Sequence, residues 1–132
     1  MQKETIKNYY DEIAKTYDQD RFGNSYGRFI HLQEKTILEQ HLSNIPRKEV
    51  IDIACGTGRF MDFCHIGIDI SPEMIKVVQD KFPDKHFLVS NILDHDLGKN
   101  SFSAAICFHL IMHLDHEDLS ILLQKVYNIL EE

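Results

Sequence analysis

The sequence predicts an α/β fold in which a parallel sheet is covered by helices on both faces. Short apolar segments alternate with helical segments from Val50 onward, a pattern typical of parallel strands joined by helices. Two apolar segments, 50–54 and 66–70, carry an aspartate close to the strand end, and the first runs into a glycine turn at 56–58. Acids beside a glycine turn at strand ends predict a ligand site at that edge of the sheet.

The first 45 residues are expected to be helical and to precede the core, 46–132, within one structural domain. Apolar residues spaced by three and four predict helices over 6–17 and 29–42. The glycines and polar residues at 23–27 predict a loop between these helices, and Pro46 follows the second one.

In the core, each element has a local signal. Strands are expected at 50–54, 66–70, 86–90 and 102–108, and helices at 71–82 and 119–130. Ser71 can cap the helix that it begins, Pro72 fits the first turn, and Pro83 stops the helix.

Composition limits the class of protein and its partners. The chain has 132 residues, 43% of them hydrophobic, and a formal charge of −7, which argues against nucleic acid or an anionic membrane as main partner. No apolar run approaches the roughly 20 residues of a membrane span. Cys55, Cys64 and Cys107 form no C-x-x-C pair, so neither a zinc knuckle nor a disulfide framework is indicated. A reducing, cytoplasmic location is expected.

Asp52 decides which cofactor the glycine turn suits. In a dinucleotide-binding turn the backbone approaches a pyrophosphate, so an anion four positions before Gly56 would be unfavourable there. A carboxylate suits a positively charged ligand end, such as an α-amino group. The third glycine of G-x-G-x-x-G is also absent, because Met61 follows Gly56 and Gly58 at that spacing. Both features favour S-adenosylmethionine over NAD.

Asp69 ends the second strand, where a carboxylate can accept both hydroxyls of a ribose. Each hydrogen bond to a charged group contributes about 1.5–3 kcal/mol. A helix cap is the other interpretation of Asp69, but Ser71 fills that position well. Ile70 and Met74 offer apolar surface to an adenine, or else are ordinary core residues.

The segment Val50 to Gly58 resembles the Val-Leu-Asp-Leu-Gly-Cys-Gly-Thr-Gly pattern of class I S-adenosylmethionine-dependent methyltransferases, especially the small-molecule type. Asp69 and the following Ser-Pro-Glu-Met are similar to the family's second strand end, and the resemblance covers nearly the whole chain. It implies a Rossmann-like fold with S-adenosylmethionine as cofactor. It also implies that the segment 9–18 is part of an N-terminal helical lid, residues 1–45, over the core, 46–132.

The resemblance implies a set of site residues. Tyr17 of the lid is placed nearest the methyl donor. Asn91 and Ile92 follow the third strand, where the family often has Gly-Asp and contacts the adenine; here Asn91 can still accept and the Ile92 backbone N–H can still donate. The segment 106–114 resembles the family's cofactor-side loop. The complete cofactor-binding set is Tyr17, Asp52, Ala54, Cys55, Gly56, Gly58, Asp69, Ile70, Met74, Asn91, Ile92, Phe108 and His109.

Two departures from the family pattern affect the expected fold. Only eleven residues separate Gly58 from Asp69, so the connection between the first two strands must be very short. The family continues with further strands after a helix like 119–130, so the sheet is expected to be truncated and the fourth strand to form an edge. A longer parent protein, a partner or second copy covering this edge, or a minimised domain would each account for it.

His109, His113 and His116 lie near three acids, an arrangement that suggests a metal only if the stretch is helical throughout. No metal is expected, and His109 is the candidate general base. The function expected is methyl transfer from S-adenosylmethionine to a small-molecule acceptor. A non-catalytic S-adenosylmethionine-binding or interaction module is the alternative, and an NAD-dependent oxidoreductase is disfavoured.

Overall fold

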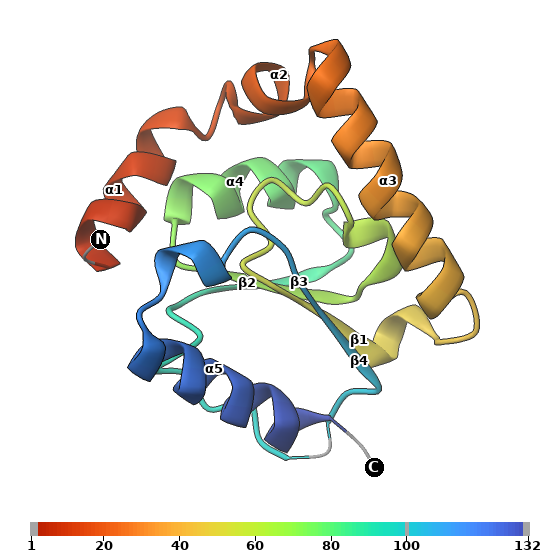
Figure 1. Cartoon of the computed structure of the whole chain (residues 1–132), viewed down its shortest axis with the longest axis vertical. Coiled ribbons are helices and arrows are strands. Elements are labelled where there is room, and N and C mark those ends of the chain that lie inside the picture. Colours follow the sequence, from red (N-terminus) through yellow and green to blue (C-terminus); the bar gives the residue numbers. More distant parts are fainter. Residues whose placement is uncertain (1–2, 100, 131–132) are drawn as a thin grey trace.

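The computed structural model describes residues 3–99 and 101–130. Its sheet contains four parallel strands in the order β3-β2-β1-β4. The predicted α/β, Rossmann-like fold with helices on both faces of the sheet is confirmed (Figure 1). The strands are β1 (Val50–Ile53), β2 (Ile66–Asp69), β3 (His86–Val89) and β4 (Ala104–Cys107).

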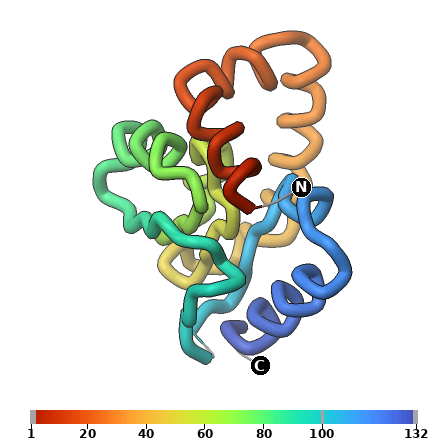
Figure 2. Tube along the Cα trace, turned by 90° about the vertical axis from the view of Figure 1, so that its left-hand side faces the viewer, coloured from red at the N-terminus to blue at the C-terminus, as the bar shows by residue number. Residues whose placement is uncertain are grey.

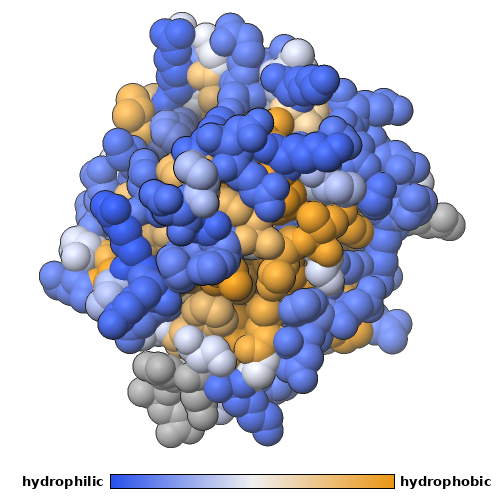
Figure 3. Space-filling model, turned by 180° about the vertical axis from the view of Figure 1, so that it is seen from behind, coloured by the Kyte–Doolittle hydropathy of each residue, from blue (hydrophilic) through white to orange (hydrophobic). Residues whose placement is uncertain are grey.

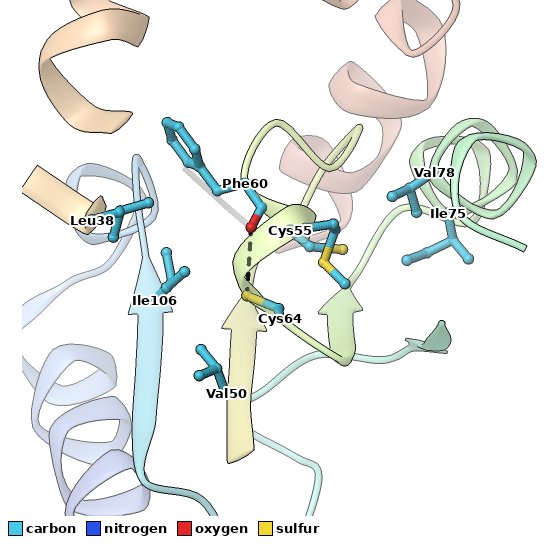
Figure 4. Packing of buried hydrophobic residues seen from close by; sticks show 9 residues of the cluster. Leu38, Val50, Cys55, Phe60, Cys64, Ile75, Val78 and Ile106 are labelled. Atoms are coloured by element: carbon cyan, nitrogen blue, oxygen red, sulfur yellow. Dashed lines mark hydrogen bonds between the residues drawn. The ribbon is translucent and has the colours of Figure 1, made fainter. Parts of the chain in front are cut away.

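Helices α3 (Ser25–Leu42) and α4 (Pro72–Lys81) cover one face of the sheet. Leu38 of α3 and Val78 of α4 join the same buried cluster as Val50 of β1 and Ile106 of the neighbouring β4 (Figure 4). Cys64 also belongs to this cluster, and its Sγ donates to the carbonyl oxygen of the cluster's Phe60 at 3.6 Å.

Helix α5 (His116–Ile129) covers the other face. Its Leu122 and Ile129 pack in a second cluster with Ile51, Ile53 and Ile68. Because both faces are covered, all four residues of β1 are buried, and the strand reads as a short apolar run interrupted by Asp52. Side chains alternate along a strand, so Asp52 projects to the same side as Val50, toward α3 and α4.

The short connection between β1 and β2 is confirmed. It contains only the 3₁₀ turn η2 (Met61–Phe63) in place of a crossover helix. The buried side chain of Met61 and the sulfur of Cys64 fill the space against the sheet that a longer helix would cover. The two strands remain parallel, with Asp52 opposite Gly67.

The N-terminal helices arch over the carboxyl end of the sheet (Figure 2). The single helix expected over 6–17 is instead two, α1 (Lys3–Ile13) and α2 (Tyr17–Phe22), separated by a turn at 14–16. The loop expected at 23–27 is largely wrong: α3 begins at Ser25, because Asn24 caps it by accepting from the backbone N–H of Gly27 at 2.7 Å.

Helix α3 buries a different face from the one that its apolar spacing suggested. Phe29 and Ile37 are 56% and 49% exposed, whereas Gly27 and Leu38 are buried. Positions 27, 31, 34 and 38 form the inward stripe, and two of them are polar. The reason lies in the partners of those polar side chains, described below.

The C-terminal elements also differ slightly in their bounds. The 3₁₀ turn η3 (Ile111–His113) follows β4, and α5 begins at His116 because the Asp115 carboxylate accepts from the N–H of Asp118 at 2.8 Å. Strand β4 is shorter than the expected 102–108, but Phe102 forms a parallel bridge with Leu130. As expected for Ser71, its hydroxyl caps α4 by accepting from Met74 N at 3.1 Å.

The opposite edge of the sheet is formed by β3, whose Val89 is 52% exposed. Seen from behind, the molecule has an apolar area near its middle, bordered by hydrophilic surface (Figure 3). Among the described helices, none is both long enough and apolar enough to cross a membrane.

Candidate functional site

A cavity lies at the carboxyl ends of the strands, beneath the arch of N-terminal helices. The chain adds β2 and β3 on one side of β1 and β4 on the other, so the loops after β1 and β4 diverge at this point, where α/β folds bind ligands. The cavity holds about 900 Å³ of empty space, its open mouth included. Its lining includes Tyr10 and Tyr17 from the N-terminal helices, Asp69 at the end of β2, and His109 and His113 after β4.

The turn after β1 exposes its backbone to this cavity. Ala54, Gly56 and Gly58 all have positive φ angles, of 60°, 54° and 84°. A Cβ on Gly56 would meet no atom within 4 Å, because that position faces open space. A Cβ on Gly58 would lie 2.3 Å from Val78 Cγ2, so this glycine lets α4 pack closely against the turn. The turn thus exposes its backbone at Gly56 and packs tightly against α4 at Gly58.

Asp69 is held against the glycine turn at the floor of the cavity. Its Oδ2 accepts from the N–H of Gly56 and its Oδ1 from the N–H of Ser71, both at 2.9 Å. Burial raises the pKa of Asp69, and these two hydrogen bonds oppose the rise. A carboxylate offers about four acceptor positions, so one stays free for a ligand after the N–H groups of Gly56, Ser71 and Ile70 are counted. Asp69 can therefore hold the glycine turn and the start of α4 and still bind a ribose.

Asp52 lies in a smaller adjoining cavity, which shares Tyr17, Ala54 and Phe108 with the larger one. The carboxyl group is only 5% exposed. Burial raises its pKa to about 8; Asp69 adds to the rise and Arg59 opposes it. Asp52 therefore carries a proton near neutral pH in this structure, and a cationic group bound beside it would favour the ionised form.

Most of the residues predicted for the site line one or both cavities. The larger cavity brings together Tyr17, Ala54, Gly56, Asp69, Ile70, Met74, Asn91, Ile92, Phe108 and His109. Asp52 and Cys55 line the smaller one. Gly58 lines neither of these two, consistent with its place under α4. Asn91 has a fixed amide, since its Oδ1 accepts from the N–H of Leu93 at 3.0 Å.

Helices α1 and α2 are attached to the rest of the domain by carboxylates of their own. Asp11 of α1 accepts from the Ser71 hydroxyl at 2.5 Å and from the N–H of Glu73 at 3.3 Å, at the start of α4. Asp18 of α2 accepts from the Thr57 hydroxyl at 2.5 Å in the glycine turn and is also paired with Lys81. The lid thus contacts the two segments that position Asp69 and the turn.

Tyr10 and His113 join the lid to η3 at the wall of the cavity. The phenol oxygen of Tyr10 lies 3.0 Å from His113 Nε2. Burial raises the pKa of Tyr10 and lowers that of His113, so near neutral pH the phenol is protonated and the imidazole neutral. A hydrogen bond between two neutral groups therefore joins the phenol to Nε2, and the imidazole tautomer decides which of them donates.

A second polar cluster links α3 to the site. Glu34 Oε1 lies 3.0 Å from Arg59 Nη2, and Glu34 Oε2 lies 3.0 Å from His109 Nε2. The Arg59 guanidinium lies over the ring of Phe22 at 3.9 Å and contacts His31 Nδ1 at 3.2 Å through Nη1. These contacts explain why polar positions of α3 point inward.

Sequence reasoning missed Tyr10, His113, Glu34 and Arg59. Tyr10 was placed on the apolar face of its helix, and its phenol gave no sign of a partner 103 positions away. Glu34 had a detectable signal, since it falls in one stripe with Gly27 and Leu38. Of the described residues, no group of three His, Cys, Asp or Glu side chains is arranged to hold a metal.

Comparison with known proteins identifies the family. Residues 50–132 match the model of a methyltransferase domain. The chain belongs to this family, that of the class I S-adenosylmethionine-dependent methyltransferases, as its motifs predicted. The family's cofactor is S-adenosylmethionine, and the residues at the strand ends fit it: the turn is open, and the two carboxyl groups suit a cation and a diol.

The chain is similar to several larger proteins. It is 33% identical over 133 residues to an uncharacterized protein of Methanocaldococcus jannaschii, covering 99% of this chain and 49% of that protein. The structure of Haemonchus contortus phosphoethanolamine N-methyltransferase 1 with phosphoethanolamine and S-adenosylhomocysteine shares its fold, with a TM-score of 0.75 and 17% identity, over 97% of this chain and 30% of that one. Synechocystis PCC 6803 magnesium protoporphyrin IX methyltransferase with bound S-adenosylmethionine has a TM-score of 0.72 and 18% identity, over 92% and 68%. The chain thus spans about half the length of its archaeal relative.

Proposed function

We propose that this chain binds S-adenosylmethionine across the two adjoining cavities and transfers its methyl group to a small-molecule acceptor. The observation that carries the proposal is the position of Asp52 and Asp69, at the ends of neighbouring strands on either side of the turn at Gly56. Membership of the methyltransferase family supports the same reading.

The adenosyl end would occupy the larger cavity. Asp69 has acceptor capacity left for a ribose hydroxyl, since the backbone N–H groups of Gly56, Ser71 and Ile70 take three of its roughly four acceptor positions. Ile70, Met74 and Ile92 line the same cavity and offer apolar surface to the adenine. Asn91 has a second acceptor position on its amide oxygen for the exocyclic amine.

The amino-acid end would occupy the smaller cavity. There the carboxyl group of Asp52 would give up its proton and pair with the ammonium group. Tyr17 and Phe108 line both cavities, so their rings would border the methyl group between the two ends.

When bound, S-adenosylmethionine supplies a methyl group on a positively charged sulfur, already activated for transfer. The chain would contribute alignment and exclusion of water, which in intramolecular models account for about 7–11 kcal/mol. Residues 1–45 would act as the lid, attached through Asp11 and Asp18, over the core, 46–132. His109, which lines both cavities, would serve as general base toward the acceptor.

Calorimetric titration with S-adenosylmethionine, S-adenosylhomocysteine and NAD tests the binding step. We expect saturable binding of the first two and none of NAD. Replacing Asp69 by alanine should weaken S-adenosylhomocysteine binding at least tenfold, because a charge-assisted hydrogen bond is lost. Asp62→Ala is the matched control: this exposed carboxylate of η2 lies outside both cavities, so the affinity should stay within twofold of wild type. Equal affinities of the two variants would contradict the ribose assignment.

Turnover needs a separate assay on a panel of amines, phenols and thiols, with release of S-adenosylhomocysteine as the readout. Methyl transfer to one of them would support the enzyme. Saturable binding without turnover would support the alternative, a non-catalytic S-adenosylmethionine-binding module. A cytoplasmic setting stays a prediction from the three cysteines, which are free thiols.

A further inference from the structure

Glu34 is a partly buried carboxylate on the inward face of α3, in contact with the proposed general base. Its side chain is 13% exposed, and its Oε2 lies 3.0 Å from His109 Nε2. A buried carboxylate is costly unless it is paired, and here it is paired twice, with Arg59 and with His109. Arg59 alone would neutralise the charge of Glu34, so the contact between Glu34 and His109 needs a separate explanation.

His109 is held in an unusual backbone conformation. Its φ angle is +62°, in the left-handed region that non-glycine residues rarely adopt, and it directly follows Phe108 at the exit of β4. Such conformations persist where the surroundings impose them, and they gather at functional sites. The ring is 40% exposed and lines both cavities, so the side chain reaches the site while one ring nitrogen faces Glu34.

The chemistry of imidazole then fixes the location of the proton. A neutral ring has one N–H donor and one acceptor nitrogen. Carboxylate oxygens only accept, so the approach of Nε2 to within 3.0 Å of Glu34 Oε2 favours the hydrogen on Nε2, which leaves the lone pair on Nδ1. Carboxylate partners fix ring tautomers in the same way in other histidine sites.

We propose that Glu34 is a positioning residue for His109: it holds the imidazole as the Nε2–H tautomer, so that Nδ1 is the basic atom offered to the methyl acceptor. This inference rests on the proposed function of His109. The other oxygen of Glu34, Oε1, lies 3.0 Å from Arg59 Nη2 without a hydrogen bond, so Arg59, which is packed against the aromatic ring of Phe22, contributes its charge to the site.

The test is a long-range ¹H–¹⁵N correlation spectrum of the histidine rings at pH 8, with His109→Gln used to assign the His109 signals. We expect the wild-type ring to show a protonated Nε2 and an unprotonated Nδ1. Glu34→Gln keeps the size of the side chain but removes the charge and presents an amide that can donate as well as accept. In this variant the two ¹⁵N shifts should move toward each other as the tautomers mix.

Glu39→Gln is the matched control, because Glu39 lies on the exposed side of the same helix and pairs only loosely with Lys35, at 4.0 Å. It should leave the ring shifts unchanged. A wild-type ring with the proton on Nδ1 would overturn the proposal without any variant, as would identical ring shifts in wild type and Glu34→Gln. Calorimetry with S-adenosylhomocysteine should give equal affinities for wild type and the control Glu39→Gln, whose side chain lies outside both cavities. The ring spectrum needs no ligand, so failure to bind S-adenosylhomocysteine would count against the proposed function alone.

Discussion

Ala54 occupies a position in the turn after β1 that suits glycine better than alanine. Its φ angle is 60°, a left-handed conformation that costs an alanine about 1–2 kcal/mol, whereas glycine adopts it freely. The methyltransferase pattern that this segment resembles has glycine there. We therefore predict that Ala54→Gly raises the free energy of unfolding by about 0.5–1 kcal/mol, the loss in chain entropy offsetting part of the gain.

Urea unfolding followed by circular dichroism measures this change. Ala105→Gly provides the control, because Ala105 lies within β4, where glycine adds entropy to the unfolded chain and also removes a methyl group packed against the second cluster. The free energy of unfolding should therefore fall by about 1–2 kcal/mol. Opposite signs for the two variants are expected. A loss of stability in both would show that the strain at Ala54 is relieved by its contacts.

Asp52 makes the stability of the protein depend on pH in an unusual direction for an acid. Its pKa is about 8 in the folded chain and about 3.9 in an unfolded one, so between these values the folded state binds more protons. The free energy of unfolding contributed by this group therefore falls as pH rises through that window, by up to roughly 1.4 kcal/mol per pH unit.

We predict that Asp52→Asn flattens this fall. Urea unfolding at pH 5, 6, 7 and 8 should give a smaller loss of stability with rising pH for the variant than for wild type. Asp80→Asn, an exposed position on α4, should keep the wild-type slope. Parallel curves for Asp52→Asn and wild type would mean that the buried carboxyl group is ionised throughout.

Helix α1 depends on one side-chain hydrogen bond for its attachment to η3. Removing the Tyr10 hydroxyl leaves His113 Nε2 without its hydrogen-bond partner, at a net cost of about 0.5–1.5 kcal/mol. Tyr10→Phe should therefore speed amide hydrogen exchange across residues 3–13 about 2–10-fold, measured by mass spectrometry. Tyr9→Phe is the control, since the Tyr9 hydroxyl accepts only from Arg21 within the lid. Faster exchange in the control than in Tyr10→Phe would contradict the role of this bond.

The elements that sequence predicted well are those whose signals are local. The strand pattern around Val50, the cap at Ser71 and the eleven-residue connection to Asp69 all follow from neighbouring residues, and the structure contains each of them. The start of α3 was missed because Asn24 acts as a cap in a segment whose glycines favoured a loop. The residues at 23–27 are compatible both with a loop and with the capped start of a helix.

The inward face of α3 could not be predicted because its partners are distant in sequence. Glu34 is buried only because Arg59 and His109 meet it, and neither lies on the same helix. By contrast, Asp52 and Asp69 were placed correctly at one edge, because parallel strands end together and register follows from the sheet. Sequence thus predicted the floor of the candidate site, while its lid contacts needed the tertiary structure.

The whole molecule is arranged so that the site is the meeting point of its parts. The lid contacts the glycine turn through Asp18 and the start of α4 through Asp11, while η3 closes the remaining wall through His113. A ligand held between Asp52 and Asp69 would touch each of these segments. Binding should therefore raise the free energy of unfolding of the whole domain, because a ligand that binds only the folded state stabilises that state.

The outer edge of β4 predicts self-association. Phe102 N donates outward to Ile129 at 3.0 Å and Ser103 N donates inward to Glu49 at 2.8 Å, so by alternation the N–H of Ala104 faces outward. In the described part of the chain no strand pairs with β4 on that side beyond the bridge at Phe102, and unpaired strand edges recruit other chains.

We expect the weight-average mass in sedimentation equilibrium to rise with concentration as a second copy covers this edge. Ala104→Pro removes an outward N–H without touching the ladder to β1, so it should weaken association at least tenfold while the fold survives. Ala105→Pro removes an inward N–H and should lower the free energy of unfolding by about 1–3 kcal/mol. A wild-type protein that stays monomeric at all concentrations would contradict the predicted self-association. Equal association of wild type and Ala104→Pro would show that the copies meet at another surface.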